Sequence, residues 1–152
     1  MLLALYDLGA AGYNANAHGC RQYGEALALL RGRKAARTLP HMTVIALGAD
    51  GSVTSGDIRQ TLKILGRKRL LVLVTPRELG GGSGPDAVTE RVEARKHTKR
   101  IRLLDWVNYS AGHGGWFQPD GVHLTTTGAQ AFTGFLKRAL KWAYPPRHRH
   151  KR

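Results

Sequence analysis

Apolar residues along the chain form two kinds of pattern, short continuous runs and longer segments at helical spacing. Residues 42–47 and 70–74 are almost wholly apolar, which is typical of strands buried on both faces of a sheet. Residues 101–106 predict a third such strand, and residues 13–18 predict a short strand that ends at a glycine. Because helical segments separate these strands, the order predicts a parallel sheet with helices on both faces.

Five helices are predicted from the remaining segments. The apolar positions of residues 55–65 recur every three or four residues, and Gly66 stands where a helix C-cap is expected. A last helix with an apolar stripe up to residue 143 follows Thr125 or Thr126, either of which is a suitable N-cap. The other helices are expected over residues 1–12, 21–37 and 85–97. These elements favour an α/β fold, a three-layer flavodoxin-like sandwich whose functional loops follow the carboxyl ends of the strands.

The chain of 152 residues is long enough for one domain with its own core. We expect that domain over residues 1–144 and a basic, disordered tail over residues 145–152. Hydrophobic residues make up 42%, which argues against general disorder, and no apolar run reaches the ~20 residues of a membrane helix.

The apolar start has no basic n-region, so no export signal is expected. Cys20 is the single cysteine, which excludes an internal disulfide.

The charge of the chain is strongly positive, because 24 lysines and arginines face 10 acidic residues for a net charge of +14. Such a balance attracts polyanions, including nucleic acid, anionic lipid and anionic wall polymers. The basic residues are spread over several patches, and no aromatic residues interleave with them as base-stacking platforms require. Solvated helix faces and a frayed tail therefore account for most of this charge, and binding of an anionic polymer stays open.

Asp120 and His123 are the most informative candidates for chemistry. They lie three residues apart in a Pro-Asp-Gly turn just before the last helix. At that spacing a carboxylate can accept a hydrogen bond from the imidazole, fix its tautomer and leave the other ring nitrogen to act as a general base. The alternative is that Asp120 only caps the turn while His123 packs beside it. A base of this kind requires a nucleophile elsewhere.

No nucleophile is evident in the printed sequence. The serines in candidate loops and helix starts lie in no Gly-x-Ser-x-Gly elbow, and capping or linker roles suit them better. They are Ser52, Ser55, Ser83 and Ser110. Cys20 is a second kind of candidate, although nothing near it in the sequence would activate a thiol. Gly19 and residues 48–51 follow predicted strands, where backbone amides can donate to an oxyanion or simply form a turn.

Together these blocks resemble the SGNH (GDSL-like) hydrolase and acyltransferase superfamily over most of the chain. The most specific match is the segment Trp-Phe-Gln-Pro-Asp-Gly-Val-His-Leu-Thr at 116–125, similar to the family's last block of Asp-x-x-His, Leu-Thr and a helix. The narrower resemblance is to bacterial domains found alone or fused to membrane acyltransferases of cell-envelope glycans. It implies that His123 is the general base and Asp120 its partner. It also implies that Gly19 helps to form the oxyanion hole.

Two departures from the family pattern affect the expected chemistry. The Gly-Asp-Ser block that supplies the family's serine is absent from the printed sequence, and its place would fall immediately before Met1. The first strand of the family's sheet would be missing with it. Asp50 stands where the family has asparagine, and an ionised carboxylate cannot donate to an oxyanion. The resemblance therefore implies that a domain with this sequence, without the family's serine, is inactive.

The activity implied by the resemblance is that of a serine esterase or O-acyltransferase acting on small acyl esters or acylated glycans. It needs no metal and no organic cofactor. If the whole protein resembles the envelope enzymes, it acts outside the cytoplasm or at the membrane, whereas the printed sequence by itself implies the cytoplasm. Two alternatives stay open: a non-catalytic module that holds an anionic wall polymer, and a small basic nucleic-acid-binding protein.

Overall fold

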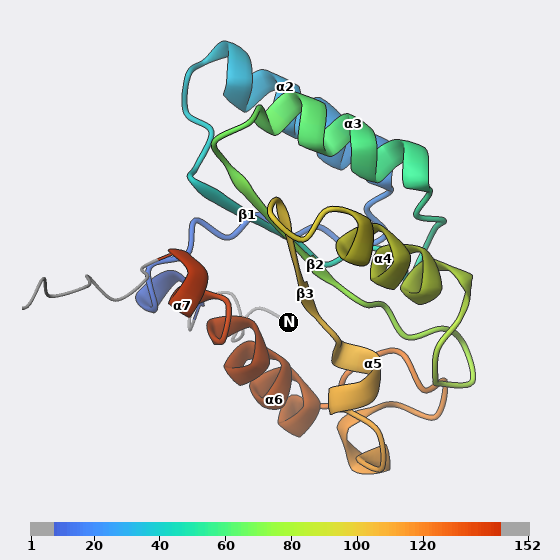
Figure 1. Ribbon diagram of the computed structural model, residues 1–152. Coiled ribbons are helices and arrows are strands. Elements are labelled where there is room, and N and C mark those ends of the chain that lie inside the picture. Colours follow the sequence, from blue (N-terminus) through green and yellow to red (C-terminus); the bar gives the residue numbers. More distant parts are fainter. Residues whose placement is uncertain (1–7, 144–152) are drawn as a thin grey trace, which may run out of the picture.

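The computed structural model describes residues 8–143 as an α/β unit built on one parallel sheet (Figure 1). The strand order is β1-β2-β3, with β2 in the centre and hydrogen-bonded to both neighbours. In chain order the elements are α2 (Tyr23–Ala35), β1 (Met42–Ile45), α3 (Ser55–Leu65), β2 (Leu70–Val74), α4 (Pro85–Lys96), β3 (Ile101–Leu104), α5 (Trp106–Tyr109), the 3-10 helix η1 (Gly114–Trp116), α6 (Thr126–Lys137) and α7 (Leu140–Ala143). The predicted fold class is confirmed.

The central strand β2 shows why the sheet is buried on both sides. Leu71 and Leu73 pack into one core and Val72 and Val74 into the other, as the two-residue period of a strand requires. All four side chains are 2% exposed or less. A continuous apolar run is therefore needed here, which is why the sequence predicted this strand at its observed bounds.

Helices cover both faces of the sheet and make the three layers (Figure 1). On one face, a core cluster joins Leu27 of α2 and Ile58 of α3 to the sheet, and α4 packs against α3 and β3. On the other face, a second cluster joins Phe135 of α6 to the sheet, together with Leu8 from the start of the described chain. The three-layer sandwich expected from the sequence is confirmed.

The strand expected over residues 13–18 is wrong. These residues have no regular secondary structure, and Ala15 and Ala17 are exposed. Alanines between asparagines bury little apolar surface, and asparagine is depleted in strands. Within residues 8–143, β1 therefore pairs with β2 alone, and the sheet has three strands.

Capping chemistry sets several helix ends as the sequence predicted. Thr125 is the N-cap of α6, because its Oγ1 accepts a hydrogen bond from the backbone N–H of Gly128 at 3.1 Å. Gly66 ends α3 with a φ of +71°, a conformation that favours glycine. The helix predicted over residues 1–12 lies mostly outside the described residues, as does the tail 145–152.

Two expectations near the carboxyl end are wrong in detail. Asp105 caps α5 by accepting a hydrogen bond from the N–H of Asn108, so Trp106 begins a helix instead of ending a strand. The last helix is also not continuous, since α6 ends at Lys137 and α7 begins at Leu140. Apolar spacing alone does not show such a break, because apolar residues recur at helical spacing across it, although no residue of α7 is buried.

Candidate active site

The turn that carries Asp120 and His123 is organised by the Asp120 carboxylate. Its Oδ1 accepts hydrogen bonds from the backbone N–H groups of Val122 at 2.8 Å and His123 at 2.9 Å. Its Oδ2 lies 2.7 Å from Nδ1 of the His123 ring. These backbone donors and the imidazole hold the pKa of the Asp120 carboxyl below its usual range. The pairing places the ring proton on Nδ1 and leaves Nε2 with a lone pair that can accept a proton.

Backbone hydrogen bonds close this turn upon itself. Gln118 N–H donates to the carbonyl of His123 at 2.7 Å, and Gly121 N–H donates to the carbonyl of Gln118 at 2.9 Å. Gly121 has a φ of +73°, and a Cβ atom there would lie 2.6 Å from the backbone nitrogen of Gly81. Glycine is therefore required at this position both by conformation and by the close approach of a second loop.

The loop after β2 packs against the turn and holds it from outside. Gly80 N–H donates to the carbonyl of Asp120 at 2.8 Å. Arg77 donates from Nε to the carbonyl of Gly121 at 3.0 Å and from Nη1 to Oγ of Ser110 at 3.1 Å. Only the folded chain shows these contacts, because Arg77 lies 44 and 33 residues from its two partners in the sequence.

Gly19 and Asp50 are the two residues that the sequence associates with the oxyanion hole. They lie on two loops that the side chain of Gln22 connects. Gln22 Nε2 donates to the backbone carbonyl of Asp50 at 2.8 Å and to that of Cys20 at 3.4 Å. The side chain of Asp50 is exposed, and so is Gly19. The structure thus brings the corner at residues 19–20 against the loop after β1.

A small apolar cavity of about 130 Å³ connects that loop to the Asp120–His123 turn. Ala49 lines it from the loop after β1, Pro76 from the loop after β2, and Val122 and Leu124 from either side of His123. Loops at the carboxyl ends of two adjacent parallel strands therefore meet the turn around one space, as expected for the functional edge of such a sheet.

None of the serines in residues 8–143 forms a hydrogen bond with His123. Ser110 is 1% exposed and donates its hydroxyl proton to the carbonyl of Trp106 at 2.7 Å. Ser83 accepts a hydrogen bond from Arg91 at 2.6 Å. The described part of the chain also has no group of three or more His, Cys, Asp or Glu side chains that could hold a metal ion. These residues thus supply a carboxylate hydrogen-bonded to an imidazole, but no serine paired with that imidazole.

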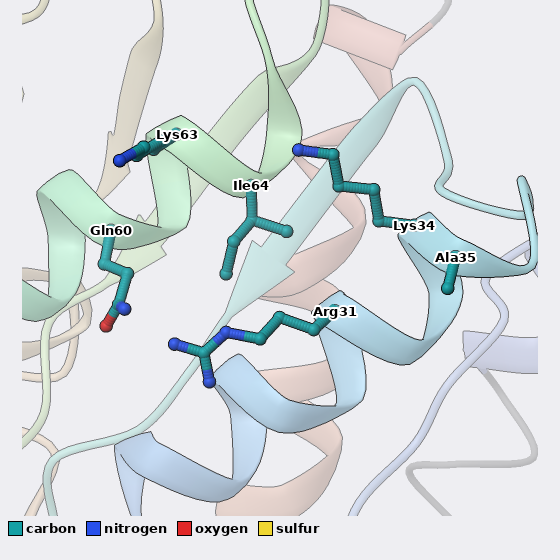
Figure 2. A pocket seen from close by; sticks show the side chains of 6 residues that line it. All are labelled: Arg31, Lys34, Ala35, Gln60, Lys63 and Ile64. Atoms are coloured by element: carbon teal, nitrogen blue, oxygen red, sulfur yellow. The ribbon is translucent and has the colours of Figure 1, made fainter.

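A second cavity, of about 520 Å³, lies between α2 and α3 and is separate from this edge (Figure 2). Its floor includes Ile64, and its walls carry Arg31, Lys34 and Lys63. Lys34 and Lys63 belong to the last turns of their helices, where cations stabilise the negative end of the helix dipole. Each of these helices is followed in the chain by a strand, β1 or β2, so their last turns lie near the amino ends of the strands. The groove is therefore at the opposite end of the sheet from the Asp120–His123 turn.

Comparison with known proteins gives a consistent group of relatives. The chain is 30% identical over 124 residues to the putative peptidoglycan O-acetyltransferase YrhL of Bacillus subtilis, which covers 80% of this chain and 19% of that protein. It is 27% identical over 116 residues to the peptidoglycan O-acetyltransferase OatA of Listeria monocytogenes, with 76% and 18% covered. The chain thus spans about a fifth of the length of these relatives, and no family model matches it.

A solved structure shares the fold. The C-terminal catalytic domain of peptidoglycan O-acetyltransferase A from Streptococcus pneumoniae, determined with a methylsulfonyl adduct, superposes with a TM-score of 0.74. The match has 24% sequence identity and covers 93% of this chain and 88% of that one. No helix within residues 8–143 is long and apolar enough to cross a bilayer.

Proposed function

Since this chain belongs to the SGNH hydrolase and acyltransferase superfamily, with peptidoglycan O-acetyltransferases among its relatives, we propose that it carries the base of an acyl-transfer site for esters of cell-wall glycans. The observation that carries the proposal is the hydrogen bond of 2.7 Å between Asp120 Oδ2 and His123 Nδ1. It lies at the edge of the sheet where the loops after β1 and β2 meet. A carboxylate that only capped the turn would not need to aim its second oxygen at the ring.

The proposed reaction uses the free nitrogen of that ring. His123 Nε2 takes the proton of a serine hydroxyl as its oxygen attacks the ester carbonyl, while Asp120 stabilises the imidazolium. The N–H of Gly19 donates to the oxyanion, and collapse transfers the proton from Nε2 to the departing alkoxide. In the second half, water or a sugar hydroxyl gives its proton to Nε2 and attacks the acyl-serine. The bond between the acyl carbon and the serine oxygen then breaks, the proton passes from Nε2 to that oxygen, and the acyl product leaves. No metal or organic cofactor enters these steps.

The serine in this mechanism is proposed to come from residues outside the printed sequence. Two observations support this: the sequence contains no Gly-Asp-Ser, and none of the described serines bonds to His123. The printed chain by itself is then a poor catalyst. The test is to compare ester hydrolysis by the printed chain with that of a chain extended upstream in its own reading frame. Equal and robust activity of the two chains would refute this part of the proposal.

A second candidate function is binding of an anionic wall polymer through the positive surface. Within residues 8–143, Arg91 and Lys96 are the two arginine or lysine side chains that pair with a carboxylate within 4 Å. Most of the positive charge is therefore not neutralised by ion pairs and is available to a polyanion. This candidate predicts salt-sensitive binding without turnover, even for the upstream-extended chain.

A further inference from the structure

Arg77 reaches from the loop after β2 to two separate parts of the site. Its Nε donates to the carbonyl of Gly121 at 3.0 Å, and its Nη1 donates to Oγ of Ser110 at 3.1 Å. The face of the guanidinium lies over the ring of Phe117, with 4.0 Å between Cζ and the ring centroid. Phe117 is itself buried and directly precedes the turn. One side chain therefore connects the end of α5, the base of the turn and the turn itself.

The contacts of Arg77 call for an arginine. Two N–H groups in one plane reach two acceptors while the flat face stacks on an aromatic ring, and a lysine ammonium cannot do all three. Ser110 gives its own proton to the carbonyl of Trp106, so its oxygen lone pair is free to accept from Arg77. Within residues 8–143 no carboxylate lies within ion-pair distance of Arg77, so charge pairing does not explain the placement.

The bond to Gly121 acts on Asp120 through one rigid peptide unit. The carbonyl of Gly121 and the N–H of Val122 belong to the same planar peptide. Arg77 holds the oxygen end of that plane, and Asp120 Oδ1 accepts the N–H at its other end at 2.8 Å. If the oxygen end is released, the peptide can rotate and its N–H no longer points at Oδ1.

We propose that Arg77 is a positioning residue: by fixing the peptide plane between residues 121 and 122, it keeps the Asp120 carboxylate aimed at Nδ1 of His123. The consequence for catalysis rests on the function proposed above, but the positioning itself does not. The neighbouring bond from Gly80 N–H to the carbonyl of Asp120 fixes the preceding peptide in the same way. Arg77 adds the side-chain contact that a substitution can remove without changing the backbone.

The test is the tautomer of His123, measured from the ring ¹⁵N shifts of labelled protein, with His123→Gln to assign the signals. The unchanged chain should hold the proton on Nδ1. Arg77→Gln and Arg77→Lys should both shift the ring toward the Nε2–H form. Arg100→Gln is the matched control, because Arg100 also donates to backbone carbonyls, those of Gly66 and Arg69, at the opposite edge of the sheet.

Retention of the Nδ1–H form in Arg77→Gln would overturn the proposal, and so would an equal shift in Arg100→Gln. If Arg77→Gln does not fold, Ser110→Ala removes one acceptor of Arg77 and changes no residue of the turn. That variant should also increase the Nε2–H fraction of His123, and an unchanged fraction would count against the proposal. The tautomer of His123 can be measured in a protein without activity. Absence of esterase activity from the upstream-extended chain would therefore refute the proposed function but would not decide whether Arg77 positions Asp120.

Discussion

At the scale of single residues, the number of hydrogen bonds that one carboxylate can accept accounts for the shape of the turn. Asp120 takes two backbone N–H groups on one oxygen and the imidazole on the other. The three-residue spacing made this pair predictable, because local hydrogen bonds depend on local sequence. The contact from Arg77 to Gly121 spans 44 residues, and no local pattern could have predicted it.

Gly121 provides a residue-scale prediction about the turn. Gly121→Ala should destabilise the protein by about 1–3 kcal/mol, because alanine is strained at positive φ and its Cβ would collide with the backbone of Gly81. Gly134→Ala is the control, because a Cβ atom at this position in α6 would meet nothing within 4 Å. That change should be neutral or stabilising by up to about 1 kcal/mol. Urea unfolding measures both, and equal effects would contradict the role of Gly121.

Asp50 provides a second prediction at this scale. If it occupies the position of an oxyanion donor, Asp50→Asn should raise the turnover of the upstream-extended chain by up to about 10²–10³-fold, because an amide can donate where a carboxylate cannot. Asp57→Asn serves as a control, because the Asp57 carboxylate accepts hydrogen bonds only from Thr54 in the capping box of α3, and its replacement should leave turnover unchanged. A rate that does not change in Asp50→Asn would contradict the placement of residue 50 at that position.

At the scale of elements, burial decided which predictions succeeded. β2 could be predicted at its bounds, because a strand buried on both faces admits only apolar residues. The strand at residues 13–18 was wrong, because alternation of small and polar residues is not enough without a partner strand to bury it. Burial also differs from residue polarity in α4, where the side chains of Glu90 and Glu93 are 0% exposed.

Glu90 gives the prediction for this scale. Both its carboxyl oxygens are buried without a hydrogen-bond partner, and burial, with Asp86 and Asp105 nearby, raises its pKa to about 9 against the opposing effect of Arg91. Between about pH 4.5 and pH 9, the Glu90 carboxyl therefore stays protonated in the folded protein, whereas in the unfolded chain, with its ordinary pKa of 4.5, it has lost the proton. Its favourable contribution to stability is complete below about pH 4.5 and is lost as the pH rises to about 9.

The variant Glu90→Gln should remove this dependence and stabilise the protein by about 1–3 kcal/mol near pH 8, because a neutral amide needs no proton. Thermal and urea unfolding between pH 5 and 9 measure the difference from the unchanged chain. Glu93→Gln is the comparison, because Lys96 lowers the pKa of Glu93 through a hydrogen bond of 2.9 Å. Glu93→Gln should destabilise the protein at pH 8. If it stabilised the protein as much as Glu90→Gln does, the contrast between the two glutamates would be contradicted.

At the scale of the whole molecule, the net charge of +14 is a separate property from the Asp120–His123 site. The basic walls of the groove in Figure 2 lie at the far edge of the sheet, so polymer binding and acyl transfer can be tested independently. Binding to inorganic polyphosphate should weaken steeply between 50 and 300 mM salt, because each released counterion contributes to the slope. His123→Ala should bind as the unchanged chain does. Absence of binding at 50 mM salt would exclude the polymer-binding candidate.

The central claim is that His123, oriented by Asp120, is the base of an acyl-transfer site whose serine lies outside the printed sequence. The most direct measurement is the rate of hydrolysis of an acetyl ester by the upstream-extended chain and by its His123→Ala variant. The account predicts clear turnover by the extended chain, a loss of about 10⁴-fold or more in the variant, and little activity in the printed chain. Turnover that is the same in all three proteins would contradict it.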